Sequence, residues 1–180
     1  MSAIQTQCRR IRQLFQGLLV LVPIMTCYYW ATIHTQYDAP LAIIAFTDTI
    51  AEYTQQPLSV TTRVLAALAS LLLCSIIMYA LTVLIRLFHN YENNNIFTLE
   101  NAQSYKKLGM TIFYWVGGSV VYSTVISVIL SFNNPPGERL IVLGFNGIDA
   151  ATVLLGGILL IISWVMLEGY KLADEQRHTV

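Results

Sequence analysis

The sequence has few charged residues for its size. Of its 180 residues, 11% are charged and 56% are hydrophobic, and its mean hydropathy is +0.60. A soluble globular domain carries roughly 25% charged residues, so a water-facing surface of ordinary polarity is excluded. The formal net charge is zero, which argues against a broad basic surface for nucleic acid. The composition therefore indicates a protein surrounded mainly by lipid.

Motifs that carry chemistry are scarce as well. The three cysteines, Cys8, Cys27 and Cys74, lack the spacing of a disulfide framework or a metal site. There is no nucleophile elbow, phosphate-binding glycine loop or recognisable pair of catalytic carboxylates. His34 and His89 fall at opposite ends of apolar runs, which excludes haem held between two histidines of one copy. We therefore expect no cofactor and no enzymatic activity.

What the sequence does contain is four apolar runs without Asp, Glu, Lys or Arg. They cover residues 14–33, 64–85, 108–132 and 150–167. A helix needs about 20 apolar residues to cross a hydrocarbon core of roughly 30 Å, and backbone amides inside lipid must bond within their own segment. The runs predict an all-α integral membrane four-helix bundle, one domain over residues 1–180. Its spans are expected at about 14–33, 60–87, 108–132 and 150–169.

Local signals mark the ends of these spans. Tyr28, Tyr29 and Trp30 near the end of the first span predict an aromatic collar at one membrane interface. Ser59 and Asp149 precede the second and fourth spans, where a side-chain oxygen can cap free helical amides.

Basic residues set the expected orientation. Eight of the ten lysines and arginines fall on one side of the four spans. They are Arg9, Arg10, Arg12, Arg86, Lys106, Lys107, Lys171 and Arg177. Basic segments are retained in the cytoplasm, so both termini and the loop between spans two and three are expected there.

Two connections on the outer side are apolar in part. Residues 40–53 predict a short helix in the outer interface, with Asp48 and Glu52 on its polar face. We expect it to cover the outer end of the bundle as a lid, with a receptor surface as the alternative. Residues 140–145 are apolar and are expected to pack beneath it.

The segments on the inner side are an inner loop, residues 88–107, and a cytosolic tail, residues 170–180. Consecutive asparagines predict a turn, and Thr98 can cap a helix over 99–107. That helix is expected to run along the inner interface before span three. In the cytosol, Asp174 and Glu175 of the tail are placed to pair with Lys106 and Lys107.

Small residues form a ridge on the third span. Ser119, Ser123, Ser127 and Ser131 recur at every fourth position, which places them on one helical face. Small residues allow helices to approach closely in lipid, and the glycine pairs at 117–118 and 156–157 add to this pattern. The other interpretation of the ridge is a polar track for a small molecule. Close packing is the favoured interpretation.

Two motifs carry a family resemblance. The first comprises Ile96, Phe97, Thr98, Leu99, Glu100, Asn101 and Ala102, followed by Tyr105, Lys106, Lys107, Leu108 and Gly109. The second comprises Glu168, Gly169, Tyr170, Lys171, Leu172, Ala173, Asp174 and Glu175, with Thr179 and Val180 at the end. With the four spans, they resemble the bacterial DUF2975 family of small membrane proteins of unknown function. The resemblance implies a protein of the bacterial cytoplasmic (inner) membrane, often encoded beside a small helix-turn-helix regulator.

The leading hypothesis is a non-enzymatic multi-pass membrane protein whose inner loop and tail engage a cytosolic partner, such as that helix-turn-helix regulator. Its candidate contact residues are Phe97, Thr98, Glu100, Asn101, Lys106, Lys107, Asp174 and Glu175. One alternative is a small-solute permease or channel subunit, oligomeric with further copies of the chain, that uses Ser119, Ser123 and Ser127. Another is an immunity-like membrane protection protein that uses Asp48 and Glu52. Direct nucleic-acid binding is not expected.

Overall fold

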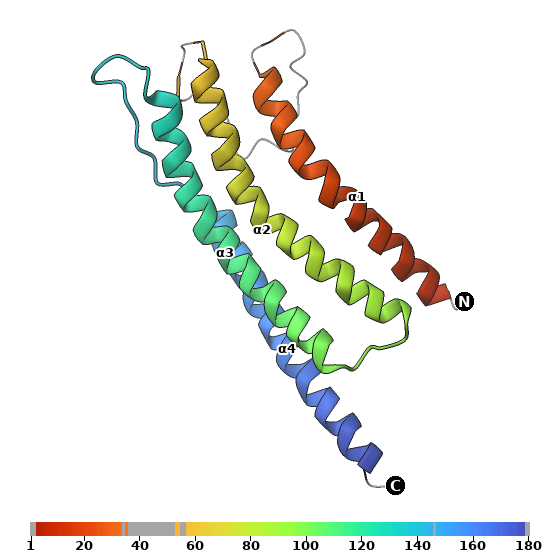
Figure 1. The fold of residues 1–180 in the computed structure, drawn as a ribbon. Helices are drawn as coiled ribbons and strands as arrows, with labels where there is room; N and C mark the ends of the chain where they lie inside the picture. Colours follow the sequence, from red (N-terminus) through yellow and green to blue (C-terminus); the bar gives the residue numbers. More distant parts are fainter. Residues whose placement is uncertain (1–2, 34, 36–52, 55–56, 146, 179–180) are drawn as a thin grey trace. The chain divides into compact units, whose positions relative to one another are not determined.

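The computed structural model describes residues 3–33, 35, 53–54, 57–145 and 147–178. In this part of the chain there are four helices and no strand, which confirms the all-α prediction. The helices are α1 (Ala3–Thr32), α2 (Val60–Glu92), α3 (Leu99–Ser131) and α4 (Gly147–His178) (Figure 1). Each contains a stretch long and apolar enough to span a membrane. The helix expected over residues 40–53, with Asp48 and Glu52, lies outside the described residues apart from Tyr53, which is in a turn.

The helices are longer than the predicted spans. They have 30 to 33 residues, or about 45–50 Å at a rise of about 1.5 Å per residue, against a hydrocarbon core of roughly 30 Å. Only residues 93–98 lie between α2 and α3, so both helices extend into the segment 88–107 that was expected as the inner loop. Residues 99–107 are the start of α3 rather than a separate interfacial helix. No proline interrupts α3, so its backbone hydrogen bonds continue into the apolar run.

Two of the three predicted helix caps are present. The backbone N–H of Asn101 donates to Thr98 Oγ1 at 3.2 Å, and that of Thr62 donates to Ser59 Oγ at 3.1 Å. Asp149 does not cap α4, because the helix already begins at Gly147 and places Asp149 inside its first turn. A negative charge there still favours the positive end of the helix dipole.

The chain divides into two compact units. The first unit comprises residues 1–19, 76–116 and 147–180, and the second comprises residues 20–75 and 117–146. Helices α1, α2 and α3 contribute to both units, whereas α4 belongs to the first. The eight basic residues expected on the cytoplasmic side all belong to the first unit.

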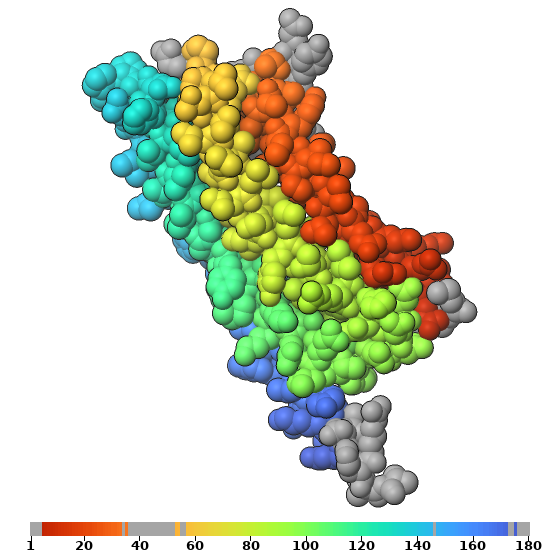
Figure 2. All heavy atoms as spheres, in the orientation of Figure 1, coloured from red at the N-terminus to blue at the C-terminus, as the bar shows by residue number. Residues whose placement is uncertain are grey.

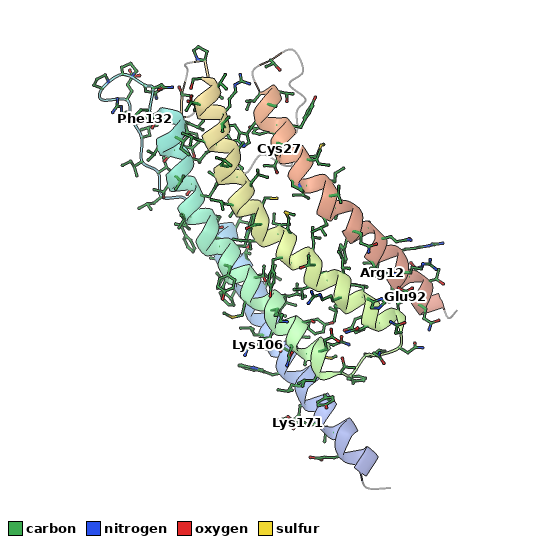
Figure 3. All side chains as sticks on the ribbon, viewed as in Figure 1. Arg12, Cys27, Glu92, Lys106, Phe132 and Lys171 are labelled. Atoms are coloured by element: carbon green, nitrogen blue, oxygen red, sulfur yellow. The ribbon has the colours of Figure 1, made fainter. Side chains whose placement is uncertain are left out.

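In the first unit, the start of α1 packs against the end of α2. Arg12 Nη2 and Glu92 Oε2 are 3.0 Å apart, at ion-pair distance but not aligned for a hydrogen bond. One turn along, the rings of Phe15 and Phe88 meet edge-on with centroids 5.5 Å apart. Figure 3 shows Arg12 and Glu92 facing each other, and the space-filling view shows atoms of the two helices in contact here (Figure 2). An ion pair and an aromatic contact therefore join the two helices.

Helices α3 and α4 approach each other closely at two glycines of the first unit. A Cβ on Gly109 would lie 3.1 Å from the carbonyl oxygen of Gly156, and a Cβ on Gly156 would lie 3.1 Å from the ring of Phe113. Gly156 thus has the packing role that was expected for the glycine pair at 156–157. Gly117 and Gly157 have no such neighbour within 4 Å, so the expected close approach fails there. Gly109 was not singled out by the sequence pattern.

In the second unit, a buried hydrogen-bond cluster joins three helices. The indole N–H of Trp30 donates to Ser70 Oγ at 2.8 Å, and the hydroxyl of Tyr122 lies 2.9 Å from the same oxygen. Trp30 is only 2% exposed, so its expected place in an interfacial collar is wrong. A tryptophan can be buried in this way when its N–H finds an acceptor, and Ser70 supplies one.

Candidate interaction surface

The connection between α2 and α3 is a tight turn built around asparagines. Asn94 has a φ of 59°, in the left-handed region that asparagine adopts more readily than most residues. The N–H of Asn94 donates to Tyr91 O at 3.1 Å, and that of Asn95 donates to Asn90 O at 3.0 Å. These bonds satisfy carbonyl groups that the end of a helix otherwise leaves unpaired.

Asn101 holds this turn from the first turn of α3. Its side chain is fully buried, and its Nδ2 donates to Asn95 O at 2.6 Å and Ile96 O at 2.8 Å. Its Oδ1 accepts a hydrogen bond from Asn90 Nδ2 at 2.9 Å. Asn101 was predicted to contact a partner, but a buried side chain cannot do so directly. It positions the turn instead, while Thr98 uses its hydroxyl to cap α3.

The same turn displays apolar side chains to the outside. Ile96 is 45% exposed, Phe97 is 59% exposed and Leu99 is 43% exposed. The ring of Phe97 also lies against α4 at Gly169, because a Cβ on Gly169 would lie 3.4 Å from that ring. The structure therefore brings the two sequence motifs together at Phe97 and Gly169.

Charged residues follow these apolar ones along α3. Glu100, Lys106 and Lys107 are exposed, and Figure 3 shows Lys106 pointing away from its helix. We name the set Ile96, Phe97, Leu99, Lys106 and Lys107 the loop surface. It combines exposed apolar side chains with two positive charges.

On the tail, Lys171 Nζ donates to Glu168 Oε2 at 3.1 Å, and both side chains are exposed. Glu175 is exposed, whereas the side chain of Asp174 lies outside the described residues. Pairing of the tail carboxylates with Lys106 and Lys107 therefore stays a prediction.

The serine ridge of α3 binds the segment that follows the helix. Ser131 Oγ accepts a hydrogen bond from Leu140 N at 3.1 Å, and Ser127 Oγ accepts one from Val142 N at 3.1 Å. Ser123 Oγ accepts a third from Gly144 N at 3.0 Å. Four helical residues rise about 6 Å, and two extended residues span nearly the same length at about 3.3 Å each. Serines four apart on a helix therefore match alternate amides of an extended segment.

We name Ser123, Ser127 and Ser131 the serine ladder. Each hydroxyl also donates its proton to a carbonyl, at Val120, Thr124 and Leu140 respectively. Ser127 and Ser131 are buried, and Ser119 lies half-buried on the same helix. The ladder hydroxyls are thus committed to the chain's own backbone rather than to an open polar track.

Residues that could hold a metal do not come together in the part of the chain that the structure describes. No three side chains among its His, Cys, Asp and Glu residues lie close enough to bind one ion.

Comparison with known proteins gives one match. The family described as "Protein of unknown function (DUF2975)" matches residues 17–180. This range contains all of α2, α3 and α4 and the second half of α1. No curated protein and no protein of solved structure matches the chain.

Proposed function

Because the chain belongs to the DUF2975 family, whose function is not known, we propose its function from its own geometry. The protein is a multi-pass membrane protein whose loop surface and tail bind a soluble regulatory protein in the cytosol. A small helix-turn-helix regulator is the partner that the family resemblance favours. The observation that supports this proposal is an ordered turn that exposes large apolar side chains.

The order of the turn matters because binding usually costs conformational entropy. Asn101 fixes the backbone at residues 95 and 96 through two hydrogen bonds, next to the exposed ring of Phe97. A side chain held before binding loses less freedom when a partner arrives. Exposed aromatic residues in such positions are typical anchors of protein interfaces.

The positive charges of the loop surface favour binding to an acidic face of the partner. Lys106 and Lys107 are exposed, and a matching acidic patch on the partner would speed encounter and set its orientation. The face of a regulator that contacts DNA is basic, because it must neutralise phosphates. The loop surface therefore suits the opposite face, and binding would hold the regulator at the membrane.

The test uses the full-length chain and, as the candidate partner, a small helix-turn-helix protein of the kind that the family resemblance implies. Both are co-expressed, the membranes are solubilised in mild detergent, and the dissociation constant is measured by biolayer interferometry. Phe97→Ser removes the central apolar anchor and is expected to weaken binding about 30-fold, which corresponds to about 2 kcal/mol. Lys106→Glu with Lys107→Glu is expected to slow association most strongly at low salt.

Phe132→Ser is the matched control, because Phe132 is also an exposed phenylalanine, 63% accessible, but belongs to the second unit. It should bind the regulator like the unaltered chain. Equal binding by Phe97→Ser would overturn the proposal.

A further inference from the structure

An apolar groove in the first unit has the features of a ligand site. It has a volume of about 490 Å³, within the roughly 300–1,000 Å³ range of small-molecule sites. Side chains of α2, α3 and α4 line it, among them Ile77, Leu84, Ile112, Trp115 and Leu159. These walls suit a hydrocarbon chain, because they offer almost no hydrogen-bonding group along their length.

A pair of tyrosines forms the polar end of the groove. The hydroxyl oxygens of Tyr91 and Tyr105 lie 2.8 Å apart, and both residues line the groove. Two hydroxyls carry two protons, and the bond between them uses only one. The described residues supply no acceptor for the second proton. A ligand with an acceptor oxygen at this end would satisfy it.

The length and position of the groove match one leaflet of a bilayer. Its α3 wall runs from Tyr105 to Trp115, which is eleven residues and a rise of about 15 Å along the helix. One leaflet provides half of a hydrocarbon core of roughly 30 Å. The tyrosine pair lies near the end of α2 and the start of α3, at the depth of lipid head groups.

Positive charge adjoins the polar end. Lys106 and Lys107 follow Tyr105 directly and are exposed. Lysines at this depth attract anionic head groups by about 1 kcal/mol each. The other hydroxyl on the wall, that of Thr111, already donates to Lys107 O at 2.7 Å, whereas the tyrosine pair keeps one proton for a ligand.

We propose that the groove is a binding site for one anionic phospholipid. One acyl chain lies between α2, α3 and α4, the tyrosine pair donates to an ester or phosphate oxygen, and Lys106 and Lys107 attract the head group. The lipid would therefore sit beside the loop surface and connect membrane composition to that surface.

The experiment uses the full-length protein, delipidated by washing in mild detergent and titrated with phosphatidylglycerol, phosphatidylcholine or palmitate. Native mass spectrometry counts the lipids that remain bound as collision energy rises. We expect one phosphatidylglycerol per chain to be retained when all others are lost. Ala80→Phe, which fills the groove from α2, should abolish this species, and Tyr105→Phe should weaken it about tenfold, as expected for one hydrogen bond to a charged group.

Matched controls separate the groove from the rest of the surface. Ala151→Phe adds the same ring at an exposed site on α4, and Tyr114→Phe removes a hydroxyl from an exposed tyrosine of α3. Both should retain the lipid. If Ala80→Phe does not give a monodisperse protein, Ile77→Phe fills the same groove from the next helical turn.

Each contrary result would overturn part or all of the proposal. Retention of the lipid by a folded Ala80→Phe chain would exclude the groove as its site. Equal retention of phosphatidylcholine would exclude recognition of an anionic head, and equal retention of palmitate would exclude the phospholipid itself. Loss of every lipid at one common collision energy would show ordinary annular lipid only.

Discussion

Single asparagines hold the irregular parts of this chain in both units. In the first unit, the Asn101 side chain forms hydrogen bonds with Asn90 Nδ2 and with the carbonyl oxygens of Asn95 and Ile96. In the second unit, Asn134 Oδ1 accepts from Thr54 Oγ1 at 2.8 Å, and its Nδ2 donates to Tyr53 O at 2.9 Å. An amide side chain offers both donors and acceptors. It can therefore form hydrogen bonds with backbone N–H and C=O groups that lie outside the helices and have no helical partner.

We predict that Asn101→Ala lowers the free energy of unfolding by about 2 kcal/mol. The substitution removes a fully buried amide that makes hydrogen bonds to Asn90, Asn95 O and Ile96 O, and the loss of such bonds costs about 1–3 kcal/mol. Unfolding is measured by titration from mild detergent into sodium dodecyl sulfate, followed by circular dichroism. Gln103→Ala, at an exposed position of the same helix, should change stability by less than about 0.5 kcal/mol. Equal stability of both variants would contradict the structural role of Asn101.

Two glycines of α3 should respond in opposite directions to the same substitution. A Cβ on Gly109 would lie 2.9 Å from Leu160 Cδ2 and 3.1 Å from Gly156 O. The end of the Leu160 side chain can move away, but the Gly156 backbone must give by a few tenths of an ångström, and we expect this strain to cost about 1–3 kcal/mol. A Cβ on Gly117 would meet no atom within 4 Å beyond the neighbouring backbone of its own helix. There alanine should stabilise the helix by up to about 1 kcal/mol. The same unfolding titration compares Gly109→Ala with Gly117→Ala. Unchanged stability of Gly109→Ala would contradict the close approach of α3 and α4, and destabilisation by Gly117→Ala would contradict the open space at that position.

At the scale of an element, α3 serves as the hydrogen-bonding partner of a non-helical segment. Irregular backbone close to lipid must find partners within the protein. The serine ladder provides them at residues 140, 142 and 144. Ile141 and Leu143, which alternate with these positions, are 76% and 78% exposed. The segment thus directs bonded amides toward α3 and apolar side chains away from it.

Ser127→Ala tests this arrangement. It removes the acceptor of the Val142 N–H at a fully buried position, so we expect a loss of about 1–3 kcal/mol in stability. Amide hydrogen exchange of the peptide covering residues 140–145 should become faster. Ser75→Ala is the control, because Ser75 is exposed and bonds to Leu72 O of its own helix. Unchanged exchange in Ser127→Ala would show that the ladder does not hold the segment.

The sequence predicted the elements that depend on composition. Runs without charge identified all four helices, since apolar length alone determines a membrane span. The end of α2 at Glu92, and the continuity of residues 99–107 with the rest of α3, escaped prediction. Hydropathy reports the length of the apolar run and not the helix that continues beyond it. Thr98 and Ser59 were predicted as caps, because capping depends on neighbours within one turn.

The candidate site was less predictable, because it depends on contacts distant in sequence. The four-residue spacing of Ser123 and Ser127 was visible, but their bonds to Gly144 and Val142 were not. Asn101 has the polarity of a surface residue, yet its neighbours Asn95 and Ile96 bury it. The hydrogen bond between Tyr91 and Tyr105 joins two helices across the turn, and no residue spacing in the sequence indicates it. Such contacts follow from the turn geometry.

At the scale of the whole molecule, the distribution of charge implies an orientation. The first unit contains eight of the ten basic residues and also the turn between α2 and α3. Translocation of basic segments is disfavoured. If this unit lies at the cytoplasmic side, an even number of spans returns both ends of the chain to that side. Arg63 and Arg139 are the basic residues of the second unit.

This orientation is tested with single cysteines in a Cys27→Ser background, because Cys27 is exposed whereas Cys8 and Cys74 are buried. Asn94→Cys lies in the exposed turn between α2 and α3, and Glu138→Cys lies in the exposed turn after α3. With a membrane-impermeant maleimide on intact spheroplasts, we expect labelling of Glu138→Cys and none of Asn94→Cys until the membrane is permeabilised. The reverse pattern would place the basic unit outside. The loop surface would then be unable to reach a cytosolic regulator, because the same turn carries both Asn94 and Phe97.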